Sequence, residues 1–478
     1  MLRYASIAVK PSLLALAVAL SACAVGPDYV APHLDLAAFH SVPKPETGRT
    51  IPAPPLDRWW IGFRDPELTA IVRRALAENL DLAAAFARIH EARAAAAGAS
   101  AQLLPTADFN AQAEAENQSL QGPIGKIAST FPAYTRDQQI YDVGPAASWE
   151  VDIFGGLQRS AAAARDEAQA AEAEGYGTRI SVAAEAADAY LQVRAYQARL
   201  AVARDQIEVN VHLLALVRHR RSDGTGNDRE VAQTEALLHQ ARATVPSLQT
   251  GLDAQLNRLD VLMGVQPGTY ARELDARHNI PLPPAITRTA GPVDLLRRRP
   301  DIIAAERRLA ESNEEIGAAI SDYYPKVSLS GALGFESMSV NELFTSRAFQ
   351  PIGAGALRWR LFDFGKIDAE VAKARGANAK ALFEYRQTVL KAIEDVEDAF
   401  SEFTQSALRQ KELRAEVASL TRSRDLSEDA YKSGVIPLTD VLDADRQLLA
   451  ARDDLVNNQA EVARAAVRSF RALGGGWT

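Results

Sequence analysis

The sequence predicts an α+β membrane protein in which one helix-and-strand unit occurs twice. Three observations lead to this fold class: segments of the second half repeat those of the first, long stretches lack proline, and short stretches alternate apolar with polar residues. The chain has 478 residues with 53 basic and 61 acidic side chains, a net charge of −8. This acidic balance disfavours a nucleic-acid-binding protein, because such binding depends on neutralising phosphates.

The first 22 residues have the features of a secretory signal peptide. Arg3 and Lys10 precede an apolar run over 13–20, and small residues lead to Cys23, the only cysteine. The run is too short to span a membrane as a helix. The position of Cys23 is similar to that in the bacterial lipobox, where the cysteine becomes the lipidated first residue. We therefore expect a signal peptide over 1–22 and a lipid on Cys23; the alternative is an ordinary signal peptide followed by a chance cysteine.

An internal repeat organises the rest of the chain. Residues 79–88 align with residues 299–308 at an offset of 220, and Trp149 aligns with Trp359 at an offset of 210. Because the offset decreases by ten, the first half carries the longer loop between 105 and 149. The predicted organisation is an amino-terminal segment over 23–65, repeat 1 over 66–262, an equatorial linker over 263–291, repeat 2 over 292–473 and a tail over 474–478.

Each repeat is predicted to contain a very long helix, a turn and a return helix. Residues 146–245 and 352–436 lack proline, which costs about 3 kcal/mol inside a helix. A helix over 157–221 would be on the order of 100 Å long, more than a globular core needs. Glycine permits the chain to reverse at Gly224 and at Gly434. Apolar residues recur every seven positions in the return helices, as in Val231, Leu238, Val245, Leu252 and Leu259, which is typical of coiled-coil packing.

Four alternating stretches predict strands at about 106–116, 139–152, 326–336 and 350–362. Strands of about ten residues with one apolar face suit a barrel with lipid outside and water inside, although a soluble amphipathic sheet has the same pattern. Four strands cannot close a transmembrane barrel, and lipid does not tolerate open edges. If these strands span the membrane, at least two chains share one barrel, and three chains would give twelve strands.

Several motifs together point to one protein family. They are Cys23 to Tyr29, Trp59 and Trp60, Asp65 and Pro66, Leu295 to Ile302, Tyr324 and Pro325, Phe362 to Gly365, and Asp440 to Ala444. With these motifs the chain resembles the outer-membrane factor family of TolC-like channels, and most closely its OprM/NodT-type lipoproteins. The resemblance implies a homotrimer whose 12-stranded outer-membrane barrel continues into an α-helical coiled-coil tunnel in the periplasm.

The resemblance also implies the function and the partners. The trimer would be the passive exit duct of a tripartite efflux system, joined by a periplasmic adaptor (membrane fusion) protein to an inner-membrane pump of the RND class. Secretion of proteins, or a lipid-tethered periplasmic scaffold, are the alternatives. The sequence contains no phosphate-binding loop or His-Glu-x-x-His pair, and its seven histidines are scattered, so neither an enzyme nor a cofactor other than the covalent lipid is expected.

The resemblance places a gate at the two helix turns. Asp440 and Asp443, one helical turn apart, match an acidic ring at the periplasmic mouth of the family's tunnel, and Glu230 occupies the equivalent of Asp440 in repeat 1. Three copies of Asp440 and Asp443 would place six carboxylates in one narrow ring, and such a ring would favour cations and repel anions. Tyr431 matches a tyrosine that pairs across protomers in the closed state. The alternatives are acidic side chains on a solvated helix surface, or a divalent-metal site that includes Asp445.

A basic position of the family's gate is occupied by Ile436 here. The family's salt bridge between protomers would therefore need another cation, for which Lys432 and Arg229 are candidates. We predict that adaptor docking uses the two turns and apolar residues exposed beside the second, namely Gly224, Gly434, Val435, Ile436 and Leu438.

Overall fold

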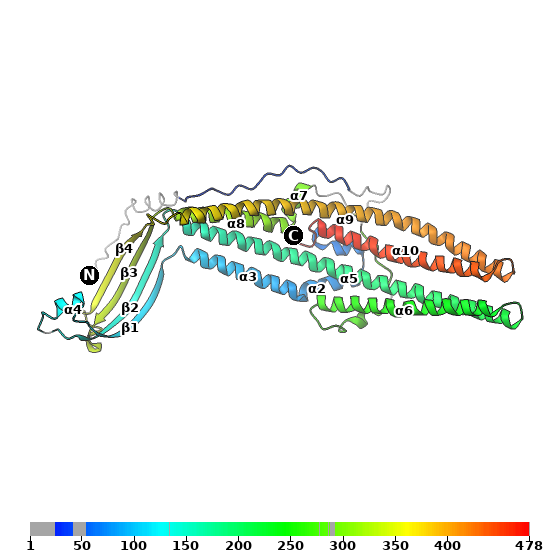
Figure 1. The fold of residues 1–478 in the computed structure, drawn as a ribbon, viewed down its shortest axis with the longest axis horizontal. Coiled ribbons are helices and arrows are strands. Elements are labelled where there is room, and N and C mark those ends of the chain that lie inside the picture. Colours follow the sequence, from blue (N-terminus) through cyan, green and yellow to red (C-terminus); the bar gives the residue numbers. More distant parts are fainter. Residues whose placement is uncertain are drawn as a thin grey trace, which may run out of the picture. The chain divides into compact units, whose positions relative to one another are not determined.

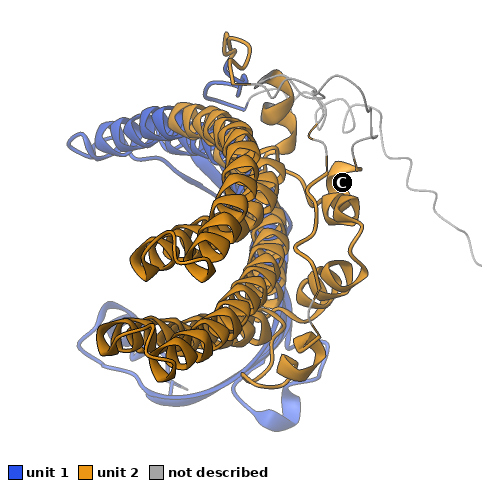
Figure 2. Ribbon diagram, turned by 90° about the vertical axis from the view of Figure 1, so that its right-hand side faces the viewer, with its two compact units in different colours: residues 1–32, 90–170, 306–384 blue, residues 33–89, 171–305, 385–478 orange. Residues whose placement is uncertain are grey.

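A computed structural model of the chain describes residues 24–41, 54–132, 134–276, 278–284, 286 and 292–477. Cys23 and the predicted signal peptide lie outside the described residues. The chain forms two compact units, coloured separately in Figure 2. The first comprises residues up to 32 together with 90–170 and 306–384, and the second comprises 33–89, 171–305 and 385–478.

The first unit contains an antiparallel sheet with the strand order β1-β2-β3-β4 (Figure 1). The strands are β1 (Thr106–Asn117), β2 (Asp137–Val151), β3 (Lys326–Ser337) and β4 (Phe349–Arg358). Directly opposed residues of an antiparallel pair lie on the same face, and the register pairs odd-numbered residues with odd-numbered ones throughout. The odd face carries Phe109, Val143, Trp149, Leu329, Leu333 and Leu357. The even face carries Asp108, Glu114, Glu150, Lys326 and Arg358. The predicted separation into an apolar and a polar face is confirmed for most of the sheet; the exceptions are Ile140 and Ile352 on the even face and Asp137 and Gln139 on the odd face.

The fourth strand is shorter than the sequence predicts. The alternation predicts a strand to residue 362, whereas β4 ends at Arg358. Arg358 lies opposite Lys326, where β3 begins, so residues 359–362 have no neighbouring strand to pair with in the described chain.

The loop from β1 to β2 contains α4 (Pro123–Ala128) and is longer than the loop from β3 to β4, which contains η3 (Val340–Glu342), as the shift in the repeat offset predicts.

Four helices belong partly to the first unit and partly to the second: α3 (Leu80–Ala101), α5 (Gly156–Ser222), α8 (Pro300–Ser321) and α9 (Lys366–Lys432). The second unit also contains η1 (Leu56–Phe63), α2 (Pro66–Glu78), α6 (Asp228–Leu262), η2 (Ala271–Leu274), α7 (Pro292–Arg298) and α10 (Leu438–Ala472). The predicted first long helix is confirmed to within one residue at each end. None of the helices in the described residues combines the length and the apolar character needed to cross a membrane.

The core of the second unit uses the aromatic residues of the amino-terminal motif. Trp59 is fully buried, and its ring stacks on Phe470 of α10 with centroids 5.5 Å apart. Asp65 caps α2 by accepting hydrogen bonds from two of its backbone N–H groups, and it also accepts one from the hydroxyl of Tyr190 at 2.8 Å. The heptad leucines Leu238 and Leu259 of α6 are buried, which confirms that this stripe is a packing face.

Candidate functional site: the helix turns and the amino-terminal segment

The two long helices of the repeats end in turns of the same geometry. Gly224 and Gly434 have φ angles of 75° and 78°, a backbone conformation that favours glycine. At the first turn the N–H of Thr225 donates to the carbonyl of Arg220, and at the second the N–H of Val435 donates to that of Ala430, both at 2.9 Å. A Cβ on either glycine would meet nothing within 4 Å, so the backbone angle and not the space requires glycine.

Behind the turns lies a small apolar cluster, which we call the turn cluster. It consists of the buried residues Leu213, Val217, Tyr431, Leu438 and Val441, with Leu216, Val231, Ile436 and Leu442 packed against it.

The position of Leu438 corrects the sequence analysis, which expected this side chain to be exposed. Leu438 is 1% exposed because it begins the buried stripe of α10 that continues with Val441 and Leu448. Ile436 is half-buried against the turn cluster, and only Val435, at 76%, is exposed as expected.

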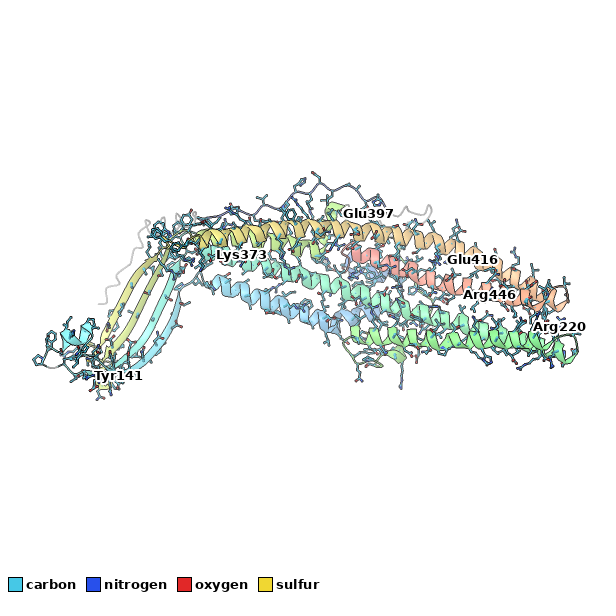
Figure 3. The ribbon with its side chains drawn as sticks, in the orientation of Figure 1. Tyr141, Arg220, Lys373, Glu397, Glu416 and Arg446 are labelled. Atoms are coloured by element: carbon cyan, nitrogen blue, oxygen red, sulfur yellow. The ribbon has the colours of Figure 1, made fainter. Side chains whose placement is uncertain are left out.

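Arg220 holds the buried tyrosine in place, and the sequence analysis did not identify it. Its Nη1 donates to the backbone carbonyl of Tyr431 at 2.8 Å, and its guanidinium lies 4.5 Å from the centre of that ring. Figure 3 labels Arg220 near the end of α5. The signal that could have identified it is the basic run His219, Arg220 and Arg221 in the last turn of a long helix. Cations are stabilised there by the negative end of the helix dipole.

The hydroxyl of Tyr431 is buried and has no hydrogen-bond partner among the described residues. Burial and the negative charge of Glu230 raise the pKa of Tyr431, against the opposing effect of Arg220. Glu230 itself lies in the first turn of α6, where its N–H donates to the side chain of Asn227, the N-cap, at 3.0 Å. The charge of the repeat-1 acid thus favours the protonated hydroxyl of the repeat-2 tyrosine.

Asp440 and Asp443 are both exposed on α10, but their charges are compensated differently. Asp443 forms an ion pair with Arg446 at 2.5 Å and accepts a hydrogen bond from Gln447 at 2.6 Å. Asp440 has no cationic group within ion-pair distance among the described residues, and its carboxylate accepts only a long hydrogen bond of 3.4 Å from Thr439. Of the two predicted ring positions, Asp440 thus presents the less compensated charge.

Asp445, by contrast, is buried and paired. Arg424 donates to one of its oxygens at 2.9 Å, while the other is buried without a hydrogen-bond partner in the described part of the chain. Burial raises the pKa of Asp445, and Arg424 opposes this effect. Lys432, a candidate gate cation, forms an ion pair with Glu428, in which its Nζ lies 2.8 Å from Oε1 of the carboxylate. Within the described ranges no three His, Cys, Asp or Glu side chains gather as metal ligands would.

A second candidate site lies in the first unit, where the residues after Cys23 pack onto the start of α5. The N–H of Val25 donates to the carbonyl of Phe154 at 3.1 Å. Arg159 of α5 donates to the carbonyl of Val25 at 3.3 Å, to Asp28 at 2.9 Å and to both oxygens of Glu314 at 2.8 and 3.1 Å. We call Arg159, Glu314 and Asp28 the amino-terminal clamp.

The segment fits closely against α8. A Cβ on Gly26 would lie 2.5 Å from the Cα of Gly317, a distance that atoms cannot adopt, and the φ angle of Gly26 is 99°. Further along, the side chain of Asn313 donates to the carbonyl of Pro27, and the hydroxyl of Tyr29 donates to Glu306 at 2.6 Å. These contacts account for the Gly-Pro-Asp-Tyr part of the amino-terminal motif as packing residues.

Comparison with known proteins decides the family. The sequence model described as "Outer membrane efflux protein" matches residues 71–265 and again residues 291–475. The chain belongs to this family. The family that the motifs predict is thereby confirmed. This outer membrane efflux protein is a transport component of the outer membrane, as the sequence analysis expects.

Relatives of this outer membrane efflux protein share most of its length. It is 31% identical over 420 residues to the pyoverdine export outer membrane protein OpmQ of Pseudomonas aeruginosa, covering 88% of this chain and 87% of OpmQ. It is 30% identical over 484 residues to the toluene efflux pump outer membrane protein TtgF of Pseudomonas putida, covering 97% and 96%. The solved structure of the outer-membrane channel OprN superposes with a TM-score of 0.86 at 31% identity, covering 95% of this chain and 100% of that one.

Proposed function

We propose that three copies of this outer membrane efflux protein form the exit duct of a tripartite efflux system, which passively conducts small molecules to the exterior without catalysing a reaction. The single observation that carries the proposal is the sheet. It has one apolar face, one polar face and, among the described residues, an unpaired edge on each side, at β1 and at β4.

A sheet of this kind is incomplete in lipid. Unpaired N–H and C=O groups at an open edge each cost several kcal/mol when no water can solvate them, so membrane-spanning sheets close into barrels. Three four-stranded sheets joined edge to edge would give twelve strands. In that closed arrangement the odd face, with Phe109, Trp149 and Leu329, contacts lipid, and the even face, with Asp108 and Glu150, lines the water-filled interior.

The long helices α5 and α9 and their return helices α6 and α10 would form the periplasmic tunnel. Their turns are the proposed docking points for the adaptor protein, which connects the duct to an inner-membrane pump of the RND class. The exposed Val435 and the half-buried Ile436 offer apolar contact beside Gly434, while Leu438 contributes through the turn cluster on which that surface rests. The acids Asp440 and Asp443 would form the ring at the tunnel mouth.

We further propose that Cys23 carries the lipid and that the amino-terminal clamp fixes where this lipid enters the membrane. Arg159 of the clamp holds Val25 by its carbonyl, and the N–H of Val25 donates to the carbonyl of Phe154, three residues after the end of β2. A lipid on Cys23 would therefore lie at the level where the sheet leaves the membrane and could insert into the nearer leaflet. The anchor and the spanning sheet would then act at the same depth.

Native mass of the detergent-extracted protein, measured separately for outer-membrane and periplasmic fractions, tests the proposal. A trimer in the outer-membrane fraction that conducts ions in planar bilayers is the expected result. A monomer that becomes soluble once the lipid is removed would overturn the shared barrel and favour the tethered scaffold instead.

A further inference from the structure

Two loops leave the sheet at the end that lies away from the long helices, and both expose apolar side chains (Figure 1). One joins β1 to β2 and contains α4, and the other joins β3 to β4. Six large side chains of these loops are between 56% and 74% exposed: Ile124, Ile127, Phe131, Met338, Val340 and Phe344. We call them the outer rim. Exposed apolar side chains gathered at one end of a protein mark a contact surface.

The outer rim continues the apolar face of the sheet. Phe335 and Phe349 lie opposite one another on the odd face, with ring centroids 5.5 Å apart. Phe344 of the rim packs on Phe335, with centroids 5.7 Å apart. The proposed function places the odd face in lipid. The rim therefore begins where the lipid-facing surface of the sheet ends.

The spacing of aromatic residues gives the level of that end in the membrane. Phe349 begins β4, and Trp359, ten positions later, directly follows its last residue. Ten residues of strand span about 33 Å, or about 25 Å along the membrane normal at a tilt of about 40°. This is the height of the apolar band that separates the two aromatic girdles of a membrane β-barrel. The loops thus leave the sheet at or beyond the depth of the lipid headgroups.

The charge of the longer loop suits an anionic lipid surface. Residues 118–136 contain Lys126 and Arg136 but no Asp or Glu, in a chain with 61 acidic and 53 basic side chains. Lys126 is exposed in the last turn of α4, between Ile124 and Ile127. Basic side chains next to exposed apolar ones are typical of segments that bind the surface of anionic membranes.

A lid over the mouth of the duct is the competing arrangement. It would place the rim on the even face, which near this end carries Glu114, Asp142 and Glu336 and one isoleucine, Ile140. The acids could meet Lys126, but they offer almost no apolar contact to the six rim side chains. A lipid surface provides both phosphate groups and acyl chains, so it satisfies the whole loop.

From these observations we propose that the outer rim rests on the outer leaflet of the membrane around the barrel. Ile124, Ile127 and Phe344 enter the boundary between headgroups and acyl chains, while Lys126 and Arg136 face the phosphate groups of anionic lipids. The inference rests on the proposed function, which places the sheet in the membrane, and adds the class of lipid that the loops bind.

A spin label on the rim tests this contact. Ile127→Cys carries a nitroxide, and the trimer is reconstituted, one per bilayer disc, in three parts phosphatidylcholine and one part phosphatidylglycerol. Collisions of the label with oxygen, which dissolves among acyl chains, are compared with collisions with a water-soluble nickel chelate. The matched controls are Leu329→Cys on the apolar face and Asp142→Cys on the polar face. The natural Cys23 is kept, and the wild type gives the background of labelling.

Oxygen is expected to relax the label at residue 127 more strongly than nickel does, as at residue 329, whereas nickel dominates at residue 142. A label at residue 127 that nickel reaches as freely as at residue 142, or that neither reagent reaches, would overturn the proposal, because the rim would then lie in water or beneath other protein. A label at residue 329 that oxygen does not reach, or a native mass of one chain, would instead overturn the proposed function, so the two failures are distinguishable.

The charge has a test of its own. Lys126→Gln should lower the ratio of lipid-accessible to water-accessible label at residue 127 about fivefold in the anionic bilayer, the effect of one basic residue near an anionic surface, and leave it unchanged in pure phosphatidylcholine. The matched control is Lys373→Gln, which removes an exposed lysine from α9 (Figure 3) and should change neither ratio. An equal ratio for Lys126→Gln and the wild type in the anionic bilayer would overturn the contact with lipid phosphates.

Discussion

Arg159→Ala is expected to destabilise the first unit far more than loss of its exposed partner does. The Arg159 guanidinium is 10% exposed and holds two carboxylates of very different exposure, Glu314 at 12% and Asp28 at 92%. Alanine at 159 leaves the buried Glu314 carboxylate without its cation, at a cost of about 3–5 kcal/mol. Asp28→Ala removes an ion pair whose acidic partner is solvated, for which about 0–1 kcal/mol is expected.

The assay is urea or heat unfolding of the purified protein in detergent, followed by tryptophan fluorescence, for the wild type and both single variants. The matched control is Arg159→Met combined with Glu314→Gln, which removes both buried charges and should recover much of the stability lost in Arg159→Ala. A second readout is protease cleavage within residues 24–32, which should become faster in Arg159→Ala. Equal losses for Arg159→Ala and Asp28→Ala, or no recovery in the double variant, would refute the reasoning that Glu314 dominates the clamp.

Three further predictions concern the turns and the acidic face of α8. Tyr431→Phe should keep the closed-state conductance and leave stability equal or higher by about 1 kcal/mol, because it removes a buried, unpaired hydroxyl; a large rise in bilayer conductance would instead show that the hydroxyl pairs across protomers. Asp440→Asn should relieve divalent-cation block of the pore more than Asp443→Asn does, since Arg446 already compensates the latter charge; equal block in both variants and the wild type would contradict the acidic ring. Burial, reinforced by neighbouring acids, raises the pKa of Glu311 to about 7. At this carboxyl the native state therefore binds more protons than the unfolded chain, and the contribution of Glu311 to stability, reduced by solvent screening, should fall by on the order of 2 kcal/mol as pH rises from 4.5 to 7. The difference between the wild type and Glu311→Gln in unfolding midpoints measured across this range should show that fall.

Local patterns were sufficient to predict most of the elements. The long helix over 157–221 follows from the absence of proline and the abundance of alanine, both of which act on each residue separately. The strand faces follow from period two, which the observed register preserves through all four strands. The turn glycines follow from the φ angles that a helix reversal requires. None of these inferences depends on which segments meet in space.

The turn cluster could not be predicted in the same way, because its members come from distant parts of the chain. Leu213 and Val217 of α5 meet Tyr431 and Leu438 only because the two turns are brought together in the folded unit. Seen in sequence, Leu438 follows a proline beside exposed residues and looks like a surface side chain. Arg220 is similarly ambiguous, since a basic residue in a last helical turn is favourable whether or not it contacts a tyrosine. Tertiary packing decides both cases.

The disagreement at β4 has a different origin, because there the sequence specifies more structure than one chain can form. The alternation continues past Arg358, with Trp359 and Leu361 on the same side as Leu357, yet β3 provides no residues beyond Lys326 to pair with them. A strand needs a neighbour for its backbone groups, so its length in one chain is set by the shorter partner. The hydrophobic pattern, in contrast, would be set by what these residues contact in the proposed assembly. Residues 359–362 are thus the place where sequence and single-chain structure should differ if a second copy completes the sheet.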